Sequence, residues 1–190
     1  MGLRVSGRIT SAALPPVRGR YVERADMSAI TWFRVGGPAD VLFTPEDEDD
    51  LAQFLKSTAS TIPVWPVGVG SNLLVRDGGV RGVVVRLGAS FAKITIDGVR
   101  VRAGAAALDS QVARTAARAG VAGLEFYRGV PGTIGGALAM NAGAWGGETW
   151  RQVVEVETVD RGGVLRRRAA AEYQTGYRRI VAPAAVARLV

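Results

Sequence analysis

Two glycine-rich segments carry the residue types that could bind a ligand rich in phosphate. The first is Gly68-Val-Gly-Ser-Asn72, and the second places eight glycines between Gly123 and Glu148. Glycine lets a ligand approach the backbone closely, and successive backbone N–H groups can form a concave anion site. This chemistry suits a large, flat ligand that carries phosphates. The structural alternatives are a tight corner between two strands for the first segment and a buried helix flanked by turns for the second.

The residue types that are missing exclude several kinds of chemistry. The chain has no cysteine and no histidine, which excludes disulfides, thiol catalysis, Ser/His triads and metal sites built from Cys or His. A cofactor linked covalently through His or Cys is excluded for the same reason. The acidic run Glu46–Asp50 has no partner residues for a metal, so we predict no metal site. Arg34, just before a glycine pair, could lie near a ligand or form a surface salt bridge with this run.

The charge pattern does not favour a nucleic-acid or membrane partner. The net charge is +7, and only two of the 24 basic residues are lysines. The arginines are spread along the chain without interleaved aromatic residues, so we predict no nucleic-acid partner and interpret the arginine content as suited to an anionic nucleotide ligand. No apolar run approaches the roughly 20 residues that cross a bilayer. The N-terminus also lacks the apolar core of a signal peptide, which favours a cytoplasmic location.

The pattern of apolar and turn residues predicts an N-terminal arm over residues 1–28, a small α/β lobe over 29–88 and a second lobe over 89–190. In the first lobe we expect strands at 40–44, 63–67, 73–75 and 83–87, with a helix that starts near Thr44–Asp47 and ends at about Ser57. In the second we expect hairpins over 94–101 and 153–168 and helices over 108–119 and from about 131 to 143. The segment at 68–72 lacks a third glycine and a following helix, so a Rossmann fingerprint is rejected.

Three segments together resemble the MurB family of flavoenzymes, the bacterial UDP-N-acetylenolpyruvoylglucosamine reductases. They read TWFRVGGPAD from Thr31, PVGVGSNLLVRDGG from Pro66 and GVPGTIGGALAMNAGAWGGE from Gly129. The resemblance implies an α+β fold of two lobes, the PCMH-type FAD-binding fold that MurB shares with the vanillyl-alcohol oxidase group. It also implies noncovalent FAD between the lobes, NADPH as co-substrate and a UDP-sugar substrate.

The resemblance assigns roles to particular residues. The FAD pyrophosphate is expected on the first loop, at Gly68, Val69, Gly70, Ser71, Asn72 and Leu73. The flavin is expected against Thr133, Gly135, Gly136, Asn141 and Gly143. Tyr177 is expected to bind substrate. Arg178 is the expected catalytic residue, because a guanidinium fork matches a carboxylate and stabilises negative charge that develops during hydride addition. A surface arginine is the alternative.

The family also has a C-terminal domain that caps the active site and supplies a serine proton donor and a glutamate. This sequence is therefore expected to correspond to the FAD-binding portion, with the capping domain absent. Two other functions stay open. One is a different FAD-dependent oxidoreductase of the same fold, and the other is a flavin-binding module without enzymatic activity.

Overall fold

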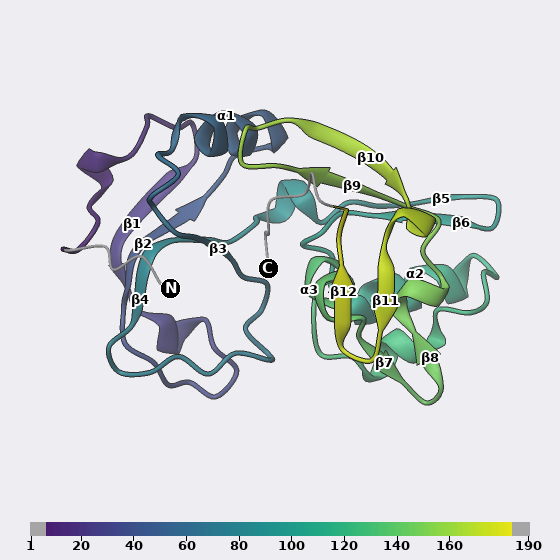
Figure 1. Ribbon diagram of the computed structural model, residues 1–190. Coiled ribbons are helices and arrows are strands. Elements are labelled where there is room, and N and C mark those ends of the chain that lie inside the picture. The colour runs from purple at the N-terminus through teal and green to yellow at the C-terminus, as the bar shows by residue number, and fades with distance from the viewer. Residues whose placement is uncertain (1–6, 184–190) are drawn as a thin grey trace. The chain divides into compact units, whose positions relative to one another are not determined.

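The computed structural model describes residues 7–183, and these form two compact units (Figure 1). Of the described residues, unit 1 contains 7–88 together with Val159–Leu165, and unit 2 contains Ala89–Thr158 and 166–183. Each unit has a hydrophobic core of its own. None of the helices within the described residues has the length and hydropathy that a membrane span requires.

Unit 1 is built on a four-stranded sheet with the order β1-β2-β4-β3. Its strands and helix are β1 (Arg20–Ala25), β2 (Ala39–Thr44), α1 (Glu48–Ser57), β3 (Val64–Pro66) and β4 (Val80–Val85). The strands β2, β3 and β4 run parallel, and β1 pairs antiparallel with β2. The continuous apolar runs of β2 and β4 are typical of parallel strands that are covered on both faces.

The alternation of side chains along β4 divides the core of unit 1 into two clusters. Val83 and Val85 pack with Phe43 of β2 and with Phe54 of α1, and the two phenylalanine rings lie 4.4 Å apart between centroids. Val84, which points to the other face, packs with Met27 and other residues. Helix α1 therefore covers one face of the sheet, as the period-two pattern of a strand requires.

The segment expected to form an N-terminal arm contributes β1 to this sheet, with Arg20 opposite Thr44 and Ala25 opposite Ala39. Asp50, a buried residue of α1, fixes the entry to β1. Its carboxylate accepts hydrogen bonds from the backbone N–H groups of Arg18 (2.8 Å), Gly19 (2.9 Å) and Glu46 (3.0 Å). The sequence did not reveal this strand, because the residue that fixes its start, Asp50, lies some thirty residues further along the chain.

Unit 2 contains two helices, several 3-10 turns and short hairpins, one of which, β9–β10, has its turn in unit 1 (Figure 1). In chain order the elements are η3 (Ala89–Phe91), β5 (Ile94–Asp97), β6 (Arg100–Ala103), α2 (Asp109–Arg118), η4 (Glu125–Gly129), α3 (Ile134–Met140), β7 (Gly143–Ala144), β8 (Gly147–Glu148), η5 (Thr149–Arg151), β9 (Glu155–Val159), β10 (Leu165–Ala169), η6 (Ala170–Glu172), β11 (Gln174–Gly176) and β12 (Arg179–Val181). The core forms where α2, η4 and α3 pack together, and its buried residues include Val112, Phe126 and Ile134. The hairpin β5–β6 packs against this core through Ile94, Val101 and Ala103.

The expected elements differ from the observed ones mainly at their ends. Helix α1 starts at Glu48 rather than near Thr44, because Asp47 is the N-cap and its side chain accepts the N–H of Asp50 at 2.9 Å. No strand forms at Leu73–Val75, where a strand was expected. That stretch instead packs against the glycines that precede β2, which is described below.

Candidate functional site

In unit 1, the loop before β2 and the loop before β4 pack directly on each other. A Cβ at Gly36 would lie 2.7 Å from the Cβ of Val75, and a Cβ at Gly37 would collide with the backbone of Asp77. Gly37 also donates its N–H to the carbonyl of Arg76 at 3.0 Å. Close backbone approach therefore explains the glycine pair, and it explains why residues 73–75 form a loop rather than a strand.

Gly70 lies in the predicted phosphate loop, where it packs against the loop before β2. Its φ is +67°, and an added Cβ would lie 2.6 Å from the carbonyl oxygen of Ile30. Its carbonyl accepts the N–H of Trp32 at 3.1 Å. The protein itself thus requires glycine at this position, whatever the loop binds. Around it, Gly68, Asn72 and Leu73 are exposed, whereas Val69 and Ser71 are half-buried.

The side chains that project from these two loops are unusually apolar for an exposed surface. Trp32, Phe33 and Leu74 are 60%, 64% and 73% exposed. Arg34 lies among them with a φ of +57°. Of the acidic run, Asp47 pairs with Arg18. Within residues 7–183 no ion pair joins Arg34 to that run, so the salt-bridge alternative for Arg34 is not observed.

In unit 2, three backbone hydrogen bonds join the glycine-rich segment to the chain before α2. Asp109 donates its N–H to the carbonyl of Gly132 (3.1 Å), and Ile134 and Gly135 donate theirs to the carbonyls of Ala107 and Ala105 (2.9 Å each). The N–H groups of Ile134 and Gly135 are therefore already bonded within the protein. These two donors are therefore not available to an anion at the start of α3, and α3 itself has only seven residues.

The three glycines expected in the flavin wall differ in what the protein requires of them. A Cβ at Gly135 would lie 3.1 Å from the carbonyl oxygen of Ala105, and a Cβ at Gly143 would collide with the carbonyl oxygen of Gly147. These two glycines are explained by packing within unit 2. Gly136 is exposed, and a Cβ there would meet only the Oγ1 of Thr133, at 3.7 Å. Its small size is not needed by the fold, so Gly136 is the glycine best explained by an approaching ligand.

Asn141 ends α3 in the left-handed conformation, with φ +45° and ψ +52°. Its side chain is buried and fully used within the protein. The Nδ2 group donates to Glu148 (3.3 Å) and to the carbonyl of Gly176 (3.2 Å), and Oδ1 accepts the N–H of Trp150 (3.1 Å). Asn141 therefore joins the end of α3 to the hairpin β11–β12.

Tyr177 and Arg178 form the two-residue turn of that hairpin, where Gly176 pairs with Arg179. Tyr177 is 88% exposed, and the guanidinium carbon of Arg178 lies 5.8 Å from the centre of its ring. Arg178 has a φ of +50°, a conformation that costs a side chain other than glycine roughly 1–2 kcal/mol. An exposed arginine at a position where glycine is favoured points to a function for its side chain.

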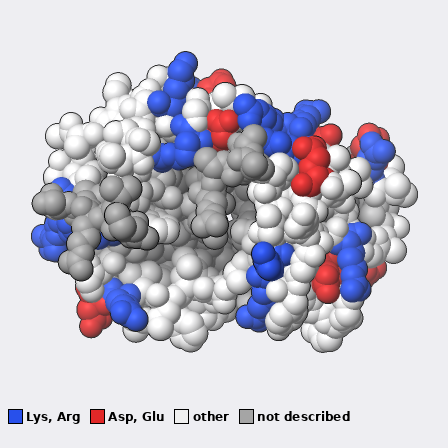
Figure 2. Space-filling view, in the orientation of Figure 1, with Lys and Arg blue, Asp and Glu red and all other residues white. Residues whose placement is uncertain are grey.

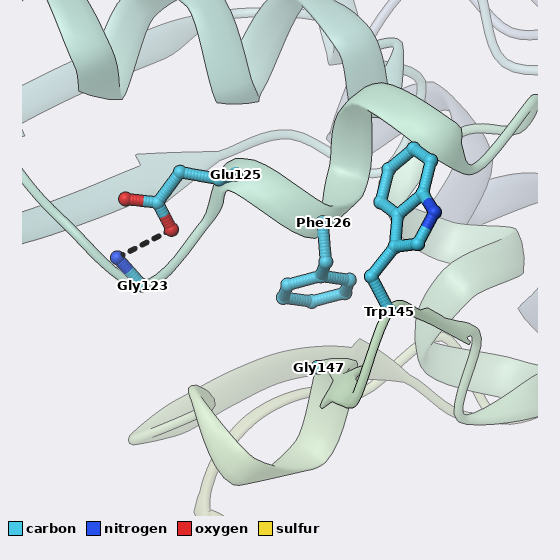
Figure 3. A pocket seen from close by; sticks show the side chains of 5 residues that line it. All are labelled: Gly123, Glu125, Phe126, Trp145 and Gly147. Carbon is cyan, nitrogen blue, oxygen red and sulfur yellow. Dashed lines mark hydrogen bonds between the residues drawn. The ribbon is translucent and has the colours of Figure 1, made fainter.

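A pocket of about 490 Å³ opens beside the glycine-rich segment, and Figure 3 shows the side chains that line it. The rings of Phe126 and Trp145 form one part of its lining, and Glu125 lies at the other end, where its carboxylate accepts the N–H of Gly123 at 2.8 Å. Trp145 is 79% exposed with a φ of +49°. The lining contains no cationic residue, so the pocket suits a ring better than a phosphate. Trp145 was not among the site residues predicted from the sequence. The glycine pair that follows it was a signal that could have drawn attention to this position.

On the face shown in Figure 2, Lys and Arg side chains form several separate groups, and acidic side chains lie beside some of them. In unit 2, for example, Arg102 and Arg167 both pair with Glu157, at 3.5 Å and 3.0 Å. Arg178 has no carboxylate partner among the described residues. Nor do those residues bring acidic side chains together in a cluster that could hold a metal ion.

The residues predicted to bind cofactor or substrate, or to act in catalysis, thus fall into two groups, one in each unit. Gly68–Leu73 belong to unit 1, whereas Thr133, Gly135, Gly136, Asn141, Gly143, Tyr177 and Arg178 belong to unit 2. Within unit 2 the structure brings the end of α3 together with the Tyr177–Arg178 turn through Asn141. Thr133 is buried and pairs with Leu108 across an isolated bridge.

Comparison with known proteins identifies the relatives of this chain. Residues 39–168 match the family described as FAD binding domain. UDP-N-acetylenolpyruvoylglucosamine reductases from Methylorubrum populi and Phenylobacterium zucineum are 51% and 57% identical over 173 residues, which is 90% of this chain. The same regions are 56% and 58% of those proteins, so the chain spans little more than half the length of these curated relatives.

Solved structures agree with the sequence comparison. The UDP-N-acetylenolpyruvylglucosamine reductase (MurB) of Thermus caldophilus is 36% identical with a TM-score of 0.72, over 88% of this chain and 58% of that one. The 6-hydroxy-D-nicotine oxidase of Arthrobacter nicotinovorans shares the fold, with a TM-score of 0.63 and 19% identity. The match covers 83% of this chain and 37% of that one. The predicted resemblance to MurB, the α+β flavin-binding fold and FAD as the cofactor are therefore confirmed.

Proposed function

We propose that this chain, which belongs to the FAD binding domain family, is the FAD-binding portion of a UDP-N-acetylenolpyruvoylglucosamine reductase. The reaction would be the NADPH-dependent reduction of the enolpyruvyl ether to UDP-N-acetylmuramate, a cytoplasmic step that supplies peptidoglycan synthesis. The observation that carries the proposal is the 51–57% identity to such reductases over nine-tenths of the chain. The exposed Tyr177–Arg178 turn, held by Asn141, supports it from the geometry.

The residues present fit the cofactor in both units. In unit 1, the exposed backbone around Gly68 and the left-handed Gly70 give the turned conformation from which backbone N–H groups can bind a pyrophosphate. In unit 2, the open space above Gly136 allows a flat ring to lie against the backbone beside Thr133. Because the chain has no His or Cys, the cofactor would be held without a covalent bond through either residue. FAD, when bound, would supply hydride transfer between NADPH and the enolpyruvyl group.

Arg178 would bind the carboxylate of the enolpyruvyl group and stabilise the negative charge that develops beside it. Its guanidinium is exposed and has no carboxylate partner within residues 7–183, so both its charge and its hydrogen-bond donors are available. Tyr177 would line the same substrate site, with its ring next to the guanidinium. The hydrogen bond from Asn141 to Gly176 would keep this turn in place relative to α3.

The test is flavin binding followed by two half-reactions. The purified chain should show a flavin absorption spectrum, and denaturation should release all of the flavin into solution. NADPH added without oxygen should bleach the bound flavin. UDP-N-acetylenolpyruvoylglucosamine should then reoxidise it slowly, because the proton donor of the family is expected in its capping domain, and fusion to the capping domain of a relative should raise that rate.

Other outcomes would support other functions. Oxidation of an alcohol without a response to NADPH would favour a different oxidoreductase of the same fold. Bound FAD that NADPH does not reduce would favour a flavin-binding module. A chain that binds no FAD, even after reconstitution, would contradict the proposal.

A further inference from the structure

A buried carboxyl group lies directly beneath the glycine-rich segment, and the proposed reaction does not use it. Asp109, the first residue of α2, is fully buried, at 0% exposure. Its Oδ2 lies 2.8 Å from the point where a Cβ at Gly132 would be, so the carboxyl packs against the backbone of that glycine. Within residues 7–183, neither carboxylate oxygen has a hydrogen-bond partner.

The surroundings of Asp109 favour its uncharged form. The segments 105–108 and 130–134, which pack against it, contain no titratable side chain. The titratable group that faces it from η4 is Tyr127, whose own pKa is raised to about 12, chiefly by burial, so the phenol stays neutral. Burial without a cationic partner raises the pKa of Asp109 to about 7. The group therefore titrates close to neutral pH.

The position of this carboxyl is coupled to the segment that carries the proposed flavin contacts. The N–H of Asp109 is bonded to the carbonyl of Gly132, and Ile134 and Gly135 are bonded to the chain just before Asp109. A charged carboxylate in this apolar site would have to reach water or a new donor, since an unpaired buried charge is costly. Because Gly132 blocks one side of it, such a movement would displace Gly132 and with it Thr133 and Gly136.

We propose that Asp109 is a positioning residue of the FAD site: as a neutral acid it fixes the path of Gly132–Gly136, and loss of its proton to solvent opens this segment and weakens FAD binding. This inference rests on the proposed binding of FAD. It predicts an affinity for FAD that decreases as the pH rises through neutrality. The matched variant is Asp109→Asn, which has the same shape as the neutral acid and cannot ionise.

The experiment measures FAD affinity by fluorescence quenching, at about pH 6 and about pH 8.5, for the chain and for D109N. Near pH 8.5 only about one molecule in thirty would keep the proton, so the apparent Kd of the parent chain should rise by up to about thirtyfold. D109N should bind FAD at both pH values with the Kd that the parent shows at the lower one. A parent Kd that does not change with pH, or a D109N variant that keeps the rise, would overturn the inference.

A second measurement covers the case in which D109N does not fold. Amide hydrogen exchange at Gly132–Gly136 of the FAD-free parent chain, corrected for the intrinsic effect of pH, should speed up between the same two pH values. Unchanged corrected exchange would count against the inference. A chain that binds no FAD at either pH would contradict the proposed function, while the exchange measurement would still test the role of Asp109.

Discussion

Replacing Gly136 by alanine separates what the fold requires from what the ligand requires. Gly136 lies in the first turn of α3, and the added methyl group would meet only the Oγ1 of Thr133, at 3.7 Å, an ordinary contact. Alanine is favoured over glycine within a helix by about 0.5–1 kcal/mol. The FAD-free variant should therefore be more stable than the parent by up to that amount.

The same methyl group should interfere with the cofactor. If the flavin lies against the Cα of Gly136, an extra methyl in a filled site costs about 1–3 kcal/mol, which weakens FAD binding roughly fivefold to 150-fold. Urea unfolding of the FAD-free chain measures the stability, and titration with FAD measures the affinity. The two effects should have opposite signs.

The matched control is Ala139→Gly on the exposed part of the same helix. It should lower the stability by a similar amount and leave the affinity for FAD unchanged. A G136A variant that binds FAD as tightly as the parent would refute the placement of the flavin at α3. A G136A variant that is strongly destabilised would show that the space above Gly136 is needed by the protein itself.

Three further substitutions test other parts of the argument. Gly70→Val should destabilise unit 1 by at least about 1–3 kcal/mol even without FAD, because φ is positive and the carbonyl of Ile30 blocks the side chain; a G70V chain as stable as its parent would contradict this. Arg178→Gly should remove roughly 1 kcal/mol of backbone strain and so make amide exchange in the hairpin β11–β12 about fivefold slower. The same change should lower the rate at which the substrate reoxidises the flavin. An unchanged reoxidation rate would mean that Arg178 is misassigned. Asp50→Ala should lower the unfolding free energy by roughly 3 kcal/mol, since three backbone donors lose their acceptor, while Asp49→Ala, an exposed control, should change it little.

Local patterns in the sequence predicted elements that are stabilised by their own residues or close neighbours. The hairpin at 94–103 forms around the Asp97-Gly98 turn, and the helix predicted at 108–119 is α2. The strand predicted at 40–44 is β2, whose apolar residues Val41, Leu42 and Phe43 are consecutive. The strand β1 was missed, because the partner β2 and the acceptor Asp50 are distant in the sequence. The strand expected at 73–75 was wrong, since the loop packing around Gly36 and Gly37 overrides its β-forming side chains.

The sequence by itself determined the class of ligand. The spacing of glycines, the absence of His and Cys and the resemblance to MurB together led to FAD held without a covalent bond through either residue. The tertiary structure alone decided what each of these residues does. Glycine is required by a positive φ or by a close backbone contact at Gly70, Gly135 and Gly143, whereas at Gly136 the fold leaves the space free. The sequence shows these four glycines as alike, because steric demand depends on which atoms the fold brings within contact distance.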